Sequence, residues 1–362
     1  MTASFGKSEL LSISLRELYQ SHGYRQYKVE KFEEYDLYAR NRSFLTGEHI
    51  LTFSDTNGKL MALKPDVTLS IIKNTRDDDR VRKLWYTENV YRVPRNAYGF
   101  QEILQTGLEC IGAVDLYTVA EVLMLAARSL QTVSEAYVLD VSHLGILTGV
   151  LGGLEAGLSA KLMAAISEKN RHALGALCAE GGVGDETACL LQSFCSLGGD
   201  IREGLPRLME MPLPPESRKA AEELSALYKL LSVFGSYKIN LDLSVTNDTD
   251  YYNGLIFRGF VDGVAAPVLS GGRYDHLLNR MGKTGSAIGF AVYVSELERF
   301  LRDAGDADFD VLLLYGPETD PADVALRVKA LAAEGLSVRA QLRGESAVTC
   351  RQVVDMTEKE AL

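Results

Sequence analysis

The spacing of apolar residues near the start of the chain predicts a helix followed by a β-hairpin. One apolar stripe at helical spacing indicates a helix over Ser8–His22; its members are Leu11, Leu15, Leu18 and Tyr19. Two apolar runs within Ile50–Leu63 flank Asn57-Gly58, and Asn-Gly between such runs is typical of a tight hairpin turn. Pro65 then ends the strand, and Asp66 is expected to cap a short helix that runs to Asn74.

Two further strands and a long helix follow in the pattern. The runs Leu84–Val93 and Ile103–Ile111 have strand character, and the loop between them contains Pro94. Asp115–Thr132 is amphipathic, with Thr118 and Glu121 at the spacing of a capping box. Hairpin-linked strands with separately grouped helices favour an antiparallel α+β sheet over a parallel one.

The composition of the chain divides it into three parts. Residues 144–234 have helical spacing interrupted by Gly-Gly pairs, which predicts a helical insertion between 1–143 and 235–302, the two halves of one core. In the second half, strands resume with a hairpin at Asp262-Gly263. After a polar linker at Asp303–Asp308, residues 306–362 contain one βαβ pattern and are expected to form a small C-terminal α/β unit.

Charge and cysteine content narrow the class of protein. The 362 residues contain 38 Lys and Arg against 49 Asp and Glu, so the net charge is 38 − 49 = −11. Binding to nucleic acid by charge alone is therefore disfavoured. Five cysteines without CxxC or zinc spacing indicate reduced thiols, no metal and a cytoplasmic location. Neither a signal peptide nor an apolar run of ~18 residues is evident, so no membrane association is expected.

One face of the strand Ile103–Ile111 is polar in an unusual way. Gln105 and Glu109 share that face with Gly107 between them, which predicts an open polar slot that suits a small polar ligand. The alternative is an ordinary solvent-facing strand. The residues of this strand are compatible with both a ligand slot and a solvent-facing strand.

Two other segments could contribute to a ligand site. Tyr251 and Tyr252 are adjacent, so on a strand one would line a cleft and the other would pack in the core; two core tyrosines are the alternative. In Gly271-Gly272-Arg273 the glycines would allow close backbone approach, and Arg273 could bind a carboxylate or phosphate. The alternative, which this segment by itself favours, is an ordinary glycine turn with a solvated arginine. No nucleophile or catalytic set is evident.

Taken in order, these segments resemble the catalytic core of class II aminoacyl-tRNA synthetases, in the histidyl branch. The resemblance covers about residues 8–301 and rests on five motifs: Lys64-Pro65-Asp66-Val67-Thr68, the stretch from Leu84 to Arg92 with Gln105–Glu109, Asp250–Gly254, Gly271–Asp275 and Gly289-Phe290-Ala291. It implies a six- or seven-stranded antiparallel sheet flanked by helices. It also implies a dimer formed through the N-terminal region.

Departures from the synthetase motifs fall on the residues that would handle ATP. Where the resemblance implies arginines, this chain has Asn247 and Glu296, and Pro94 replaces a glutamate, although Arg92 is retained. Adenylation requires positive charge at the ATP phosphates, so these replacements argue against it. The short C-terminal unit also argues against tRNA as a substrate.

A synthetase-like core with an amino-acid pocket and an impaired ATP site resembles the regulatory subunits of ATP phosphoribosyltransferase. The resemblance implies a non-catalytic, cofactor-free chain that binds histidine and confers feedback control on the first step of histidine biosynthesis. It further implies a homodimer within a hetero-oligomer that contains the short-form catalytic subunit. The implied histidine-binding residues are Asp66, Thr68, Arg92, Gln105, Glu109, Tyr251, Tyr252 and Arg273. The alternatives are a synthetase paralogue that adenylates an amino acid and a stand-alone histidine-binding protein.

Overall fold

The computed structural model describes residues 6–45, 49–78, 80–93, 99–246, 251–301, 307–344 and 348–357. The chain forms two compact units: one is Leu11–Leu297, and the other combines Met1–Leu10 with Glu298–Leu362. No helix in the described ranges is long and apolar enough to cross a membrane. The loop residue Pro94, the motif residue Asn247 and linker residues 302–306 lie outside the described residues.

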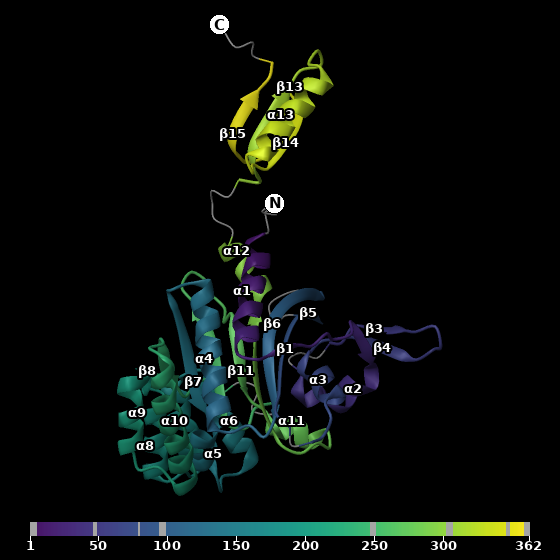
Figure 1. The fold of residues 1–362 in the computed structure, drawn as a ribbon. Helices are drawn as coiled ribbons and strands as arrows, with labels where there is room; N and C mark the ends of the chain where they lie inside the picture. Colours follow the sequence, from purple (N-terminus) through teal and green to yellow (C-terminus); the bar gives the residue numbers. More distant parts are fainter. Residues whose placement is uncertain are drawn as a thin grey trace. The chain divides into compact units, whose positions relative to one another are not determined.

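The larger unit is built on a nine-stranded sheet with the order β1-β5-β6-β12-β11-β10-β7-β9-β8 (Figure 1). In that order the strands are β1 (Arg25–Gln26), β5 (Arg82–Arg92), β6 (Gln101–Gly112), β12 (Ser286–Tyr293), β11 (Leu269–Arg273), β10 (Leu255–Val261), β7 (Tyr137–His143), β9 (Ile239–Asp242) and β8 (Gly198–Asp200). From β5 to β7 every neighbouring pair is antiparallel, which confirms the predicted core. The structure adds the short strands β1 and β8, whereas β9 lies within residues 239–245, whose alternation of apolar and polar residues predicts a strand. The β1/β5 and β7/β9 pairs are parallel.

Two long helices cover one face of this sheet. In α1 (Lys7–Ser21) the predicted stripe is buried, and the Tyr19 hydroxyl is hydrogen-bonded to Ser129 of α4 (Leu116–Val133) at 3.0 Å. The expected capping box in α4 is wrong, because the N-cap is Asp115, whose carboxylate accepts the Thr118 N–H at 2.8 Å. Glu121 instead pairs with Lys83 of β5 at 2.6 Å, so α4 is tied to the sheet.

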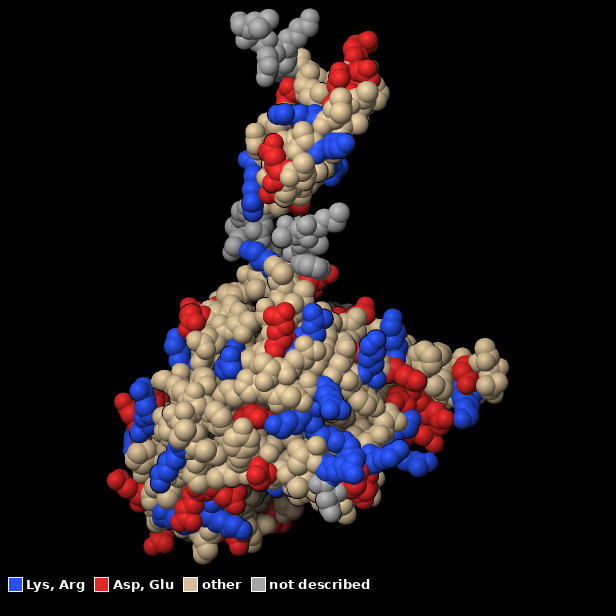
Figure 2. Space-filling view, in the orientation of Figure 1, with Lys and Arg blue, Asp and Glu red and all other residues tan. Residues whose placement is uncertain are grey.

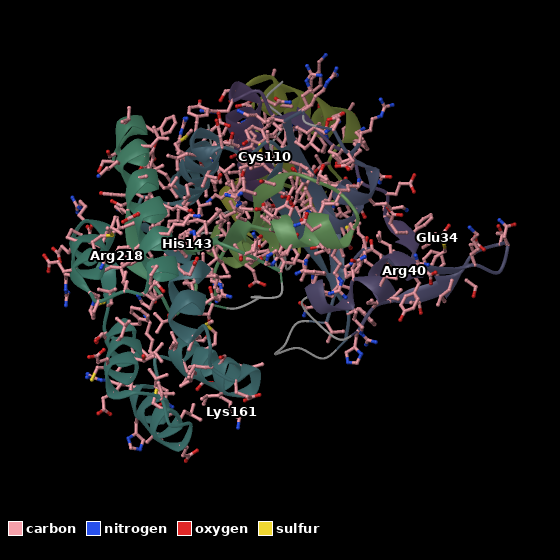
Figure 3. The ribbon with its side chains drawn as sticks, turned by 90° about the horizontal axis from the view of Figure 1, so that it is seen from below. Glu34, Arg40, Cys110, His143, Lys161 and Arg218 are labelled. Atoms are coloured by element: carbon pink, nitrogen blue, oxygen red, sulfur yellow. The ribbon has the colours of Figure 1, made fainter. Side chains whose placement is uncertain are left out.

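A small three-stranded sheet lies beside the large one and carries the predicted hairpin. Its order is β2-β4-β3, and its elements are β2 (Phe32–Glu34), β3 (Thr52–Ser54) and β4 (Leu60–Leu63), with α2 (Tyr35–Arg40), the 3-10 turn η1 (Arg42–Phe44) and α3 (Thr68–Asn74) packed around them. Gly58 has φ +79°, as the Asn-Gly turn requires. Glu34 and Arg40 belong to this part, well separated in Figure 3 from His143 at the end of β7.

Helices and the short strand β8 fill the segment between β7 and β9. The helices are α5 (Leu144–Leu151), α6 (Ala156–Ser167), α7 (Arg171–Glu180), α8 (Asp185–Phe194), α9 (Ile201–Glu210) and α10 (Pro215–Phe234). The longest of them, α10, packs on α5 and α4, and the Ser217 hydroxyl donates to the Ile146 carbonyl at 2.7 Å. These helices belong to the same compact unit as the large sheet. Later in the chain, α11 (Asp275–Arg280) precedes β12 and α12 (Val294–Leu301) follows it.

The C-terminal unit contains a parallel three-stranded sheet with the order β14-β13-β15. Its elements are β13 (Phe309–Tyr315), α13 (Pro321–Ala333), β14 (Val338–Leu342) and β15 (Cys350–Asp355). The βαβ pattern predicts the first three. The strand β15 was not predicted, because its exposed residues Arg351 and Gln352 interrupt the apolar run that would have marked it.

Candidate functional site

A polar recess opens between the large sheet, the start of α3 and the segment before β10. The recess is open to solvent, and its cavity volume is ≈ 70 Å³. Seven of the eight residues singled out in the sequence line it: Asp66, Thr68, Arg92, Gln105, Glu109, Tyr251 and Tyr252. The structure thus brings together residues from three distant parts of the chain. Their role in binding stays a prediction.

Glu109 is the most buried acid of the recess. It lies on β6 with 2% of its surface exposed. Its carboxyl accepts hydrogen bonds from the Thr68 hydroxyl at 2.6 Å and the Tyr274 hydroxyl at 2.5 Å. Burial raises the pKa of Glu109 to about 8, with nearby Asp66 adding to the rise. The carboxyl of Glu109 is therefore protonated near neutral pH, and it can share or transfer this proton to a basic group of a bound ligand.

Space for this carboxyl is provided by Gly289, which pairs with Glu109 across β12 and β6. A Cβ atom at position 289 would lie 1.8 Å from Glu109 Oε2, far inside van der Waals contact. The geometry of the acid therefore depends on the absence of a side chain on the neighbouring strand.

The predicted slot between Gln105 and Glu109 is polar but not open. Tyr86 of β5 is paired with Gly107, and its hydroxyl would lie 2.7 Å from a Cβ atom at position 107. The space left by the glycine is therefore occupied by the Tyr86 ring, and Gln105 and Glu109 are both buried beside it. The solvent-facing alternative does not hold for this strand.

Asp66 and Arg92 form a charged pair at one end of the recess. Asp66 Oδ1 accepts the Leu69 N–H at 2.8 Å, so this carboxylate binds the start of α3 as predicted, although the N-cap residue is Val67, one position later than expected. Asp66 Oδ2 lies 3.7 Å from the Arg92 guanidinium. Burial raises the pKa of Asp66 and Arg92 opposes that rise, so the pair offers both a carboxylate and a guanidinium to a ligand.

Aromatic rings form the opposite wall. The rings of Tyr251 and Tyr252 lie 4.7 Å apart between centroids, and Tyr251 also contacts Tyr274 at 5.8 Å. Both line the recess, so the expectation that they face opposite ways is wrong. The reason is that they precede β10, which begins at Leu255, and strand alternation does not apply to them.

Arg273 is the predicted residue that the structure does not bring to the recess. It lies on the other face of β11, where its Nε donates to Asp275 at 2.8 Å and its Nη2 donates to Ser286 at 3.1 Å. There it lines a separate cavity of ≈ 310 Å³ with His143 and Glu223. Its neighbour Tyr274 and the preceding Ser270 face the recess instead.

Several lining residues were missed by the sequence reasoning, among them Phe44, Tyr86, Ser270, Tyr274, Gly289 and Tyr293. Tyr274 could have been found, because alternation along β11 places it opposite to Arg273. Ser270 shares that face of β11 with Tyr274. Tyr86, Gly289 and Tyr293 line the recess because of which strands are neighbours in the sheet, and Phe44 because of how η1 packs; the sequence pattern shows neither.

The recess combines features that suit a small zwitterion with a polar ring. Asp66, Thr68 and Gln105 can accept hydrogen bonds from an ammonium group, and Arg92 can pair with a carboxylate. A buried carboxyl and tyrosine hydroxyls at the far side can pair with ring nitrogens.

Comparison with known proteins places the chain among synthetase-like proteins. The family profile described as histidyl-tRNA synthetase matches residues 3–297. The ATP phosphoribosyltransferase regulatory subunit of Clostridium kluyveri is 30% identical over 336 residues, which are 89% of this chain and 86% of that protein. The protein of the same name from Caldanaerobacter subterraneus subsp. tengcongensis is 33% identical over 291 residues, 78% of this chain and 75% of that protein.

Solved structures agree on the fold. An ATP phosphoribosyltransferase regulatory subunit/histidyl-tRNA synthetase from Bacillus halodurans matches with a TM-score of 0.76 and 21% identity, covering 98% of this chain and 96% of that one. A chain of the ATP phosphoribosyl transferase (HisG:HisZ) complex from Thermotoga maritima matches with a TM-score of 0.64 and 19% identity, covering 79% of this chain and 97% of that one. Both support the synthetase-like fold.

Proposed function

This chain belongs to the family of ATP phosphoribosyltransferase regulatory subunits, within the histidyl-tRNA synthetase fold family, and on that premise we propose that it binds free histidine and inhibits a catalytic partner. The observation that carries the proposal is the single recess lined by Asp66, Thr68, Gln105, Glu109 and the tyrosine pair. Histidine supplies an ammonium group, a carboxylate and an imidazole, and the recess offers a complementary group for each.

In the proposed complex, the ammonium group lies among Asp66, Thr68 and Gln105, and Arg92 pairs with the carboxylate. The imidazole lies between Glu109 and the hydroxyls of Tyr251 and Tyr252. Thr68 links the two ends, because its hydroxyl donates to Glu109 at 2.6 Å. Each such partner contributes roughly 1–3 kcal/mol, or about 5- to 150-fold in affinity. Arg273 lies outside the recess and is left out of the proposed site.

We further propose that the chain does not catalyse adenylation. Glu296 occupies the position of an expected arginine and is an exposed acid in the first turn of α12. Negative charge there would oppose binding of a polyanion. Asn247 and Pro94, the other two departures, add to this argument from the sequence.

Exchange of pyrophosphate into ATP should therefore stay at background with the purified chain, histidine and magnesium present. An authentic histidyl-tRNA synthetase assayed in parallel provides the positive control. Histidine-dependent exchange above background would contradict the proposal and favour an adenylating paralogue.

The proposed partner is a short-form ATP phosphoribosyltransferase catalytic subunit. A chain with a histidine pocket and no reaction of its own can control metabolism only by coupling that pocket to another active site. Such coupling requires histidine to bind one state of the assembly better than another, with a typical difference of ~1–3 kcal/mol. The similar fold of a chain in the Thermotoga maritima complex supports such an assembly. We also propose a homodimer within it and a cytoplasmic location.

Mixing the two subunits should give a complex in which histidine suppresses formation of phosphoribosyl-ATP. Tyr252→Ala removes part of the aromatic wall and should raise the histidine concentration for half-inhibition by about tenfold or more while the subunits still co-elute. Tyr237→Ala, outside the recess, is the matched control. Subunits that neither co-elute nor respond to histidine would contradict the proposal and favour a stand-alone histidine-binding protein.

A further inference from the structure

Lys283 places its ammonium group at the C-terminal end of α3. It donates to the carbonyl oxygens of Ile72, Lys73 and Thr75, with 3.2 Å to that of Lys73. Carbonyl groups in the last turn of a helix lack partners along the helix and carry partial negative charge. One ammonium group therefore caps the end of α3 from a loop that lies more than two hundred positions later in the chain.

The residue after Lys283 makes a second link to the same place. Thr284 donates to Asp77 Oδ1 through its backbone N–H at 2.8 Å and through its hydroxyl at 2.9 Å. Asp77 follows α3 closely in the chain. The pair Lys283-Thr284 thus holds both the last turn of α3 and the segment that leaves it.

The opposite end of α3 belongs to the candidate site. Thr68 is the first residue of the helix and donates to Glu109, and Asp66, two positions before it, accepts the Leu69 N–H. The first five residues of α3 are all buried. At ~1.5 Å per residue the seven-residue helix is only ~10 Å long, so a displacement of one end also moves the other.

The loop that carries Lys283 is itself joined to the other wall of the recess. It follows α11, which begins directly after the recess residue Tyr274. The first residue of α11, Asp275, accepts the Ala287 N–H at 2.9 Å and so fixes the start of β12. Figure 1 shows α3 and α11 side by side, and Figure 2 shows basic side chains gathered over this part of the surface.

We propose that Lys283 is a positioning residue for the ligand site, which sets the distance between its ammonium-binding end and its aromatic wall. Lys283 does not touch the ligand; it acts through α3 on Asp66 and Thr68. This inference rests on the proposed histidine site and adds a specific part to it. Loss of Lys283 should therefore weaken contacts to the ammonium group of histidine more than contacts to the imidazole.

The test compares two ligands by calorimetry: histidine and imidazolepropionate, which is histidine without the amino group. In Lys283→Met the Kd for histidine should rise roughly tenfold, while the Kd for imidazolepropionate changes less than about twofold. Lys283→Arg retains a cation at this position, so its Kd for histidine should return most of the way to the wild-type value. Lys229→Met, on the exposed surface of α10, is the matched control.

Thr284→Val provides an independent variant if Lys283→Met is too unstable to study, and the same ligand difference is expected on a smaller scale. Equal weakening of both ligands, or no weakening of either, would overturn the positioning role. A wild-type chain that binds neither ligand would instead overturn the proposed function, so the two failures are distinguishable.

Discussion

Replacing Gly289 by alanine is expected to raise the Kd of histidine by roughly 100-fold. The new methyl group would lie 1.8 Å from Glu109 Oε2 and 2.5 Å from the Leu108 carbonyl oxygen. The carboxyl must therefore leave its position between Thr68 and Tyr274, and the backbone beside it must shift as well. Displacement of a buried, charge-assisted partner costs about 1.5–3 kcal/mol, and strain from overpacking adds to that. Calorimetric titration of the purified variant with histidine measures the change.

Gly254→Ala is the matched control for this substitution. Gly254 is also buried, but a Cβ atom there would be no closer than 3.7 Å to any neighbour, which is ordinary contact. Its histidine affinity should stay within about twofold of wild type. If Gly289→Ala folds and binds histidine as tightly as this control, Glu109 is not part of the binding site.

Histidine affinity is expected to be highest between about pH 6.5 and 8 and to fall by up to tenfold per pH unit on either side. Unliganded Glu109 has a pKa of about 8, and the imidazole of free histidine has a pKa near 6.5. Between these two pH values Glu109 is protonated and the imidazole is neutral, so the two groups together hold one proton. In the complex they share that proton, and binding neither releases a proton to solvent nor takes one up. At higher pH the complex must take up a proton, and at lower pH it must release one.

Glu109→Gln tests the upper limb of this profile. Glutamine has nearly the same shape and does not ionise, so the decline that begins near pH 8 should move to higher pH. Any decline that remains reflects loss of the ammonium proton of histidine. Titration at several pH values in buffers of different ionisation enthalpy also counts the protons directly. An unchanged upper limb in the variant would show that Glu109 does not carry the shared proton.

Local patterns in the sequence sufficed for most of the individual elements. The stripe of α1, the Asn-Gly turn between β3 and β4, and the Asp66 carboxylate at the start of α3 were all predicted, because each depends on residues a few positions apart. The strands β1 and β8 were missed, because two or three residues are too few to show a period.

The set of candidate site residues came from the order of the motifs along the chain, and the arrangement of those residues came only from the fold. Side chains on strands alternate, so Gln105 and Glu109 could be assigned to one face in advance. The sequence could not show that Tyr86 fills the place above Gly107, since that depends on the register between β5 and β6. For the same reason the sequence could not show that Gly289 leaves space for the Glu109 carboxyl, because that depends on the pairing of β12 with β6.

The errors have the same physical origin. Tyr251 and Tyr252 were assigned to opposite faces because a strand was assumed, whereas the strand begins only at Leu255. Arg273 was grouped with the site by its motif, and the pleat of β11 turned it to the other face. The sequence by itself therefore determined the elements, the family resemblance and the kinds of chemical group available. Tertiary structure alone decided which groups meet, how deeply Glu109 is buried and where Lys283 reaches α3, because contacts between distant segments depend on strand order and register.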